Sequence, residues 1–131
     1  MLKRSLLCLF LLLGTCFGGA KHRLVTPNFV KQPMMIIDIR TEPEWRETGL
    51  VHGAIPLTFF DEKGRYDAEV FLAKLEKYVT KETPFALICR TGNRTSAVAE
   101  FLGELGYEVI NLQGGMVELV KQGYQPAPYR P

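Results

Sequence analysis

The chain has 131 residues, enough for one domain with a buried core and too few for two ordinary domains. Its 47% apolar and 23% charged residues exclude an intrinsically disordered chain and a polytopic membrane protein. The formal charge of +2 is too small to predict nucleic-acid binding through bulk electrostatics, and three cysteines are too few for a small disulfide scaffold.

The first 20 residues have the order of features found in a secretory signal peptide. Lys3 and Arg4 precede an unbroken apolar run over residues 6–13, and small residues follow at 18–20. The run is too short to span a bilayer, which takes about 20 apolar residues, and it lacks the amphipathic period of a core helix. We therefore predict that residues 1–20 are a signal peptide for export and that a single domain follows over residues 21–124.

Two cleavage positions remain open. Cleavage after Ala20 would release a soluble protein that begins at Lys21, and we favour this reading. The alternative is that residues 13–16 act as a bacterial lipobox, which would leave Cys16 as a lipidated N-terminus on a membrane surface. Thr15 is a poor residue directly before such a cysteine, so the lipobox is the weaker match.

Removing residues 1–20 changes the charge and the cysteine content. It takes away two basic residues and no acidic one, so the formal charge of +2 falls to zero. Cys8 and Cys16 leave as well, so Cys89 becomes the only cysteine of the domain. A lone cysteine cannot form an internal disulfide, so it is a buried inert residue, an intermolecular link or a reactive group.

The domain alternates between short apolar runs and capped amphipathic segments. The runs that predict strands are 23–25 (an edge strand), 34–37, 54–57, 85–89 and 109–112. The segments that predict helices are 26–31, a short helix capped by Thr41, 67–79, 95–105 and 116–122. Residues 125–131 contain three prolines and predict an extended tail over the surface. This order predicts an α/β fold, with a mainly parallel sheet flanked by helices on both faces.

Each of the two longest predicted helices has an apolar stripe that we expect to face the core. In the segment 67–79 the stripe is Phe71, Leu72, Leu75, Tyr78 and Val79. In the segment 95–105 it is Ala97, Val98, Phe101, Leu102 and Leu105.

Two buried strands end in polar residues, and ligands of such sheets bind at the carboxyl ends of strands. One end carries Asp38 and Arg40. The other carries Cys89 and a loop that leads toward a helix, formed by Arg90, Thr91, Gly92, Asn93, Arg94 and Thr95. Such a loop can turn several backbone N–H groups toward one point, where the helix dipole also favours an anion. A cysteine in this positive cradle is expected to be rich in thiolate and able to attack an electrophilic sulfur or phosphorus.

Two other readings of the loop compete with this one. A cysteine at the end of a strand is often a small buried residue without chemistry. Asn93 to Thr95 also matches the short glycosylation sequon, a pattern of low specificity. The combination of cysteine, glycine and arginine between a strand and a helix favours the functional reading.

Four segments, in this order, resemble signatures of the rhodanese-homology (sulfurtransferase) domains, and the resemblance extends over about residues 23–124. Residues 38–45 resemble the Asp-x-Arg stretch that runs to an aromatic residue, and residues 49–55 resemble Gly-His-Ile-Pro-Gly-Ala. Residues 89–94 match the Cys-x-x-Gly-x-Arg active loop, and residues 112–116 resemble Leu-x-Gly-Gly-Ile. Three positions depart from the pattern: Leu50 stands where the family often has His, His52 where it often has Pro, and Leu119 where it often has Trp.

The resemblance implies a single-domain thiosulfate sulfurtransferase of the periplasmic bacterial type. Cys89 would take a sulfane sulfur from a donor such as thiosulfate, become a persulfide, and pass the sulfur to cyanide or another thiophilic acceptor. The N–H groups from Arg90 to Thr95 would hold the persulfide. We expect no cofactor, and no metal because the two histidines, His22 and His52, are isolated. We also expect a monomer that binds no nucleic acid and touches a membrane only if Cys16 is lipidated.

Two alternative functions stay open. The domain could carry persulfide sulfur to a protein partner with little turnover on small molecules. It could also be a cysteine-dependent phosphatase, although the related phosphatases have one residue more between the cysteine and the arginine than the four between Cys89 and Arg94. The shorter loop favours sulfur over phosphate.

For the remaining candidate residues we prefer a structural role over a catalytic one. Asp38 and Arg40 could flank the pocket, but an ion-pair network that fixes the loop is the stronger hypothesis. His52 could act as a general base, but a lone histidine near a turn is more often structural. Trp45 is expected in the core or in the pocket wall.

Overall fold

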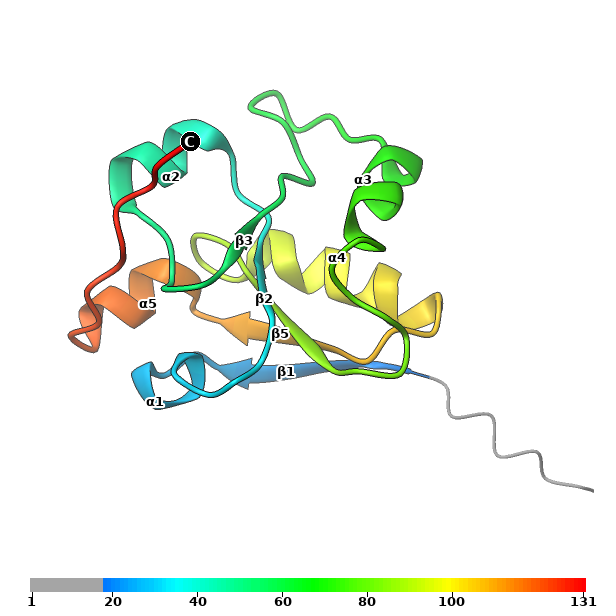
Figure 1. The fold of residues 1–131 in the computed structure, drawn as a ribbon, viewed down its shortest axis with the longest axis horizontal. Helices are drawn as coiled ribbons and strands as arrows, with labels where there is room; N and C mark the ends of the chain where they lie inside the picture. Colours follow the sequence, from blue (N-terminus) through cyan, green and yellow to red (C-terminus); the bar gives the residue numbers. More distant parts are fainter. Residues whose placement is uncertain (1–17) are drawn as a thin grey trace, which may run out of the picture.

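The computed structural model describes residues 18–131, which form a five-stranded sheet with helices on both faces (Figure 1). Most of the predicted signal peptide, including Cys16 of the alternative lipobox, lies outside the described residues. The strands are β1 (Ala20–Leu24), β2 (Ile36–Asp38), β3 (Ile55–Pro56), β4 (Phe85–Ile88) and β5 (Val109–Gln113). Their spatial order is β1-β5-β4-β2-β3, and every neighbouring pair is parallel. The predicted α/β fold is therefore confirmed.

Four helices connect successive strands and a fifth follows β5, and helices cover both faces of the sheet. They are α1 (Pro27–Val30), α2 (Glu42–Thr48), α3 (Ala68–Leu75), α4 (Asn93–Glu104) and α5 (Gly115–Lys121). One core cluster joins the sheet to α3 and α4, and the other joins it to α1 and α5. β4 lies between β5 and β2 with all four residues buried, which explains its uninterrupted apolar sequence.

The helix starts follow the predicted caps. The Thr26 and Asp67 side chains accept the backbone N–H groups of Phe29 and Val70, both at 3.1 Å. Thr41 and Glu44 form a reciprocal capping box at the start of α2. These caps satisfy N–H groups that have no acceptor inside their own helix.

The predicted extent of α3 was wrong at its C-terminus. The helix ends at Leu75 rather than near Val79, although the Val79 N–H still reaches the Leu75 carbonyl at 3.1 Å. Phe71, Leu75 and Val79 of the predicted stripe are buried, whereas Tyr78 is exposed because the chain leaves the helical path after Leu75.

The predicted inward face of α4 was also wrong in part. Val98 and Leu102 are buried as expected, but Ala97 and Leu105 are exposed. Small residues take the inward positions instead, and a Cβ added to Gly103 would lie 2.7 Å from the Ala20 nitrogen. The helix turns this face to the sheet because a small residue lets α4 approach β1 closely.

Both ends of the described chain are held in place. β1 begins three residues before the predicted edge strand, and the Gly19 carbonyl accepts the Val109 N–H at 3.2 Å. The extended C-terminal tail forms an antiparallel bridge between Leu50 and Ala127. Tyr129 then packs on the Trp45 ring, with 5.5 Å between the ring centroids. Within residues 18–131 no helix combines the length and apolar character needed to cross a membrane.

Candidate active site

The cysteine loop is shorter than the sequence predicted. β4 ends at Ile88 and α4 begins at Asn93, two residues before the predicted start at Thr95. Gly92 is the N-cap residue of α4 with φ of 95°, and its carbonyl accepts the Ser96 N–H at 3.0 Å. This left-handed conformation, which glycine adopts most readily, lets the helix begin at once.

The Cys89 thiol is buried beneath this turn. The residue is 1% exposed, and its Sγ lies 3.2 Å from the Gly92 nitrogen, which donates to it. Thr95 Oγ1 is 3.3 Å from the same sulfur. The first turn of α4 contributes further N–H groups that lack an acceptor within the helix, and the positive end of the helix dipole lies at this turn. The sulfur therefore sits where an anion is stabilised.

The start of α5 forms hydrogen bonds to the backbone of the cysteine loop. The Met116 and Val117 N–H groups donate to the Cys89 and Arg90 carbonyls at 2.9 and 3.0 Å. Gly115, the first residue of α5, has φ of 58°, and a Cβ added there would lie 2.4 Å from the Cys89 carbonyl oxygen. We predicted the Gly114-Gly115 pair only as a turn into the last helix, but Gly115 also lets α5 dock on the loop.

Replacing Gly115 with alanine is expected to lower the free energy of unfolding by about 2 kcal/mol or more, because it adds a backbone clash to an unfavourable φ. Gly123→Ala is the matched control, since Gly123 also has a positive φ but no atom within 4 Å of an added Cβ. Urea denaturation of both variants measures the difference. Equal losses would show that the contact of Gly115 with the loop contributes nothing.

Arg94 is held in a bidentate ion pair with Glu44 of α2. Its Nη1 and Nη2 lie 2.8 and 2.6 Å from the two carboxylate oxygens, and both side chains are partly buried. Burial raises the pKa of Glu44, but hydrogen bonds from Arg94 and Thr41 and the Arg94 charge outweigh it and lower that pKa to about 2. The hydrogen bond to Glu44 raises the pKa of Arg94. Arg94 thus ties the first turn of α4 to α2, and Glu44 is a site residue that we did not predict.

Glu44→Gln is expected to reduce the free energy of unfolding at pH 7 by about 1–3 kcal/mol, since it removes a charged hydrogen-bond partner of Arg94. The pKa of Glu44 falls from 4.5 to about 2 on folding, so this stabilisation is complete above pH 4.5 and is lost as the pH falls toward 2. Unfolding midpoints should therefore converge at low pH. Glu42→Gln, on the same helix but in an exposed pair, is the control. A difference that stays constant down to pH 2 would contradict this account.

Asp38 and Arg40 form a buried network beside the loop. Arg40 Nη2 lies 2.8 Å from an Asp38 oxygen, and the two residues are 1% and 0% exposed. The Trp45 indole N–H also donates to Asp38 at 3.0 Å, while the guanidinium reaches Thr48 and the Gly49 carbonyl. Within residues 18–131 neither side chain hydrogen-bonds to residues 89–95. The pair thus fixes the β2–α2 connection rather than the cysteine loop named in the ion-pair hypothesis, and Arg40 lines the cavity that Arg90 also lines.

Arg90 is the cationic side chain of the loop that stays exposed. Among the described residues it takes part in no ion pair. It lines a cavity of about 340 Å³ between α2 and α5, together with apolar side chains such as Val117 and Val120. Asn93 and Thr91 are also exposed at the loop, whereas Thr95 is fully buried.

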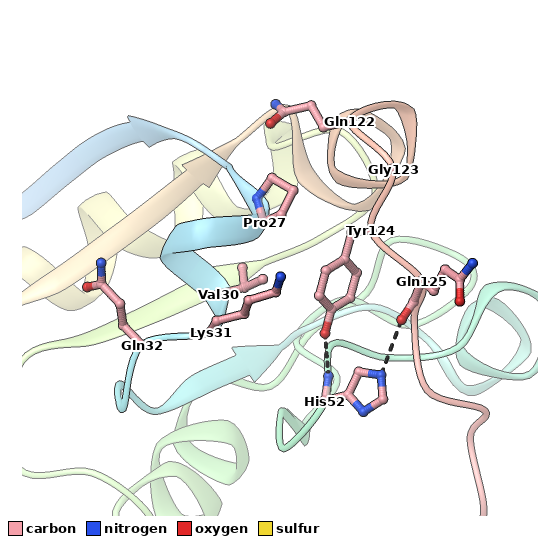
Figure 2. A pocket seen from close by; sticks show the side chains of 9 residues that line it. All are labelled: Pro27, Val30, Lys31, Gln32, His52, Gln122, Gly123, Tyr124 and Gln125. Carbon is pink, nitrogen blue, oxygen red and sulfur yellow. Dashed lines mark hydrogen bonds between the residues drawn. The ribbon is translucent and has the colours of Figure 1, made fainter.

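His52 lies apart from the cysteine loop. It lines a cavity of about 680 Å³. Its backbone N–H donates to the Tyr124 hydroxyl oxygen at 3.0 Å, and its Nε2 lies 3.2 Å from the Gln125 carbonyl oxygen (Figure 2). None of the residues that line this cavity belongs to the stretch 89–95. His52 thus packs against the chain after α5 and has no contact with the sulfur.

The Asn111 side chain is linked to the sulfur indirectly, through the Thr95 hydroxyl. Thr95 Oγ1 donates to Asn111 Oδ1 at 2.5 Å, and Asn111 is 1% exposed in β5. We predicted this strand as a plain apolar run. An asparagine in the middle of a buried strand is the signal that could have identified it, because a buried amide needs partners.

A family model of the rhodanese-like domain matches residues 23–122, a range that contains every element from α1 to α5. The chain therefore belongs to the rhodanese-like domain family, a family of sulfurtransferase type. "Putative sulfurtransferase YtwF" of Bacillus subtilis is 26% identical to it over 86 residues, which are 66% of this chain and 73% of that protein.

Solved structures share the fold. A rhodanese-related protein from Thermoplasma volcanium has a TM-score of 0.58 at 22% identity and covers 78% of this chain and 94% of its own. A rhodanese-like domain protein from Staphylococcus aureus has a TM-score of 0.56 at 22% identity and covers 74% of this chain and 88% of its own.

Proposed function

We propose that the chain is a thiosulfate sulfurtransferase in which Cys89 carries the transferred sulfur. The Cys89 thiolate attacks the outer sulfur of thiosulfate, the sulfur–sulfur bond of the donor breaks, and sulfite leaves with the electron pair. Cyanide or another thiophilic acceptor then attacks the outer sulfur of the persulfide and regenerates the thiolate. The observation that carries this proposal is the position of Cys89 Sγ against the Gly92 N–H and the first turn of α4.

The burial of Cys89 supports a small donor. Cys89 is almost fully buried, so a compact anion reaches its sulfur more easily than the bulky aryl group of a phosphate ester. The four residues between Cys89 and Arg94 favour sulfur over phosphate in the same way.

The exposed positive charge of Arg90 is an argument for an anionic donor. Its side chain is exposed at the loop and free of ion pairs within residues 18–131, whereas Arg94 is held by Glu44. In our proposal Arg90 attracts dianionic thiosulfate and the backbone N–H groups stabilise the persulfide.

The test is the formation of thiocyanate from thiosulfate and cyanide by the purified chain. We expect turnover with thiosulfate and no hydrolysis of an aryl phosphate. A folded protein that hydrolyses the phosphate through Cys89 and makes no thiocyanate would replace this proposal with the phosphatase alternative.

We further propose that residues 1–20 direct export to the bacterial periplasm. The two cleavage positions differ in their effect on the fold, because a cut after Ala20 removes the Gly19 carbonyl that accepts the Val109 N–H, whereas a cut before Cys16 keeps it. Mass spectrometry of the exported chain separates an N-terminus at Lys21 from a lipidated Cys16. Recovery of the uncut chain from the cytoplasm would contradict export.

A further inference from the structure

A chain of four hydrogen bonds leads from the buried sulfur to the surface. It runs from Cys89 Sγ to Thr95 Oγ1 (3.3 Å), from Thr95 Oγ1 to Asn111 Oδ1 (2.5 Å), from Asn111 Nδ2 to His22 Nδ1 (3.0 Å), and from His22 Nε2 to Glu100 Oε1 (2.8 Å). The first three side chains are at most 1% exposed, whereas the side chains of His22 and Glu100 are 29% and 60% exposed. The buried thiol is thus connected to an imidazole that can exchange protons with solvent.

Each side chain in this series of hydrogen bonds has a fixed number of protons to donate, so the directions of the four bonds depend on one another. The Thr95 hydroxyl has one proton and two acceptors in reach besides the sulfur, Asn111 Oδ1 at 2.5 Å and the Gly92 carbonyl at 3.2 Å. The proton goes to the nearer Asn111, which leaves a lone pair facing Cys89. Asn111 in turn gives an amide proton to His22 Nδ1, so His22 is neutral and its proton is on Nε2, facing Glu100. In this arrangement Thr95 can accept a proton from a Cys89 thiol but gives nothing to a thiolate.

Protonation of His22 reverses these directions. Both ring nitrogens of the imidazolium are donors, so Nδ1 needs an acceptor and Asn111 must turn its amide oxygen toward it. The Asn111 amide nitrogen then donates to Thr95 Oγ1, and the Thr95 hydroxyl proton is released for the sulfur at 3.3 Å or the Gly92 carbonyl at 3.2 Å. A thiolate is charged and the carbonyl is neutral, so the thiolate is the stronger acceptor. The Glu100 carboxylate accepts from Nε2 in both states.

We propose that His22 is a positioning residue whose protonation turns the Thr95 hydroxyl toward Cys89 and favours the thiolate. In this step Cys89 releases its proton to solvent and His22 takes one from solvent, so the number of protons on the pair is unchanged. The inference rests on the proposed function only in that the thiolate is the reacting form.

The charged groups around His22 and around the Cys89 sulfur are consistent with this coupling. From α4 the group that faces His22 is the Glu100 carboxylate, and from β5 it is the uncharged Asn111. Lys21 and Arg23 precede and follow His22 on β1, so their side chains point to the opposite face of the strand. At the sulfur, the nearby cation is Arg94, whose charge acts on Cys89 whether or not His22 is protonated.

The experiment measures the rate of alkylation of Cys89 by iodoacetamide between pH 5 and pH 9. The full chain carries Cys8→Ser and Cys16→Ser, so that Cys89 is its only thiol. The variant is His22→Gln, which cannot titrate. We expect the ratio of the rate at low pH to the rate at high pH to be about tenfold larger with His22 than with glutamine, the value of one buried hydrogen bond. His52→Gln is the matched control and should reproduce the unaltered profile.

A second measurement keeps the inference testable if His22→Gln is unstable. Coupling between two sites is reciprocal, so removing the sulfur must change the titration of His22. The ring protons of His22, followed by NMR, should titrate about one pH unit lower in Cys89→Ala than in the chain that retains Cys89. His52 should titrate identically in both.

The outcomes separate this inference from the proposed function. Superimposable alkylation profiles with His22 and with glutamine, or an unchanged NMR titration of His22 in Cys89→Ala, would overturn the coupling whatever the thiocyanate assay gives. If the alkylation profiles with His22 and with glutamine differ but the chain forms no thiocyanate, the coupling is supported and the proposed function is overturned.

Discussion

Cys89→Ser is expected to form thiocyanate at least about 10³-fold more slowly than the unaltered chain. A serine hydroxyl remains protonated at neutral pH and cannot accept a sulfane sulfur as a persulfide. The loss should appear in the rate of turnover with thiosulfate and cyanide both saturating, because the variant lacks the group that reacts.

The fold of this variant provides the control. The serine oxygen can still accept the Gly92 N–H and contact Thr95, so the thermal unfolding midpoint should change little. Residual turnover above about a tenth of the original rate in a folded serine variant would show that Cys89 is not the sulfur carrier.

Arg40→Leu is expected to lower the free energy of unfolding by about 3–5 kcal/mol, the largest loss of stability that we predict. The substitution leaves the Asp38 carboxylate fully buried with only the Trp45 indole N–H and the backbone N–H of residue 40 as partners. Urea denaturation of the variant and of the unaltered chain measures this loss.

Arg65→Leu is the matched control for that experiment. Arg65 also pairs with an aspartate, Asp61, but its side chain is 72% exposed, so its removal should cost less than about 1 kcal/mol. Equal effects of the two substitutions would contradict the view that burial makes the Asp38–Arg40 pair important for the fold.

Alternating apolar runs and caps were sufficient to predict the fold. The buried strand at Phe85–Ile88 and the capped helix start at Asp67 follow from local sequence, because burial on both faces and cap chemistry act over a few residues. The chemistry of the cysteine loop was equally local: a cysteine, a glycine and an arginine between a strand and a helix.

Contacts between distant segments could not be predicted in this way. Glu44 could be identified as a capping residue of α2, but nothing near it in the sequence indicates that it also holds Arg94, 50 residues later. The inward face of α4 depends on how closely Gly103 approaches β1, which is a property of the packed sheet. The same is true of His22 and Asn111, which only the pairing of β1 with β5 brings together.

The central claim is that Cys89 carries the transferred sulfur, and the most direct test is the mass of the peptide that contains it. After treatment of the chain with thiosulfate, we expect this peptide to gain the mass of one sulfur atom and to lose it again when cyanide is added, with thiocyanate formed in equal amount. A stable gain that cyanide does not remove would indicate the persulfide-carrier alternative. No gain at Cys89 in the folded chain would contradict the claim.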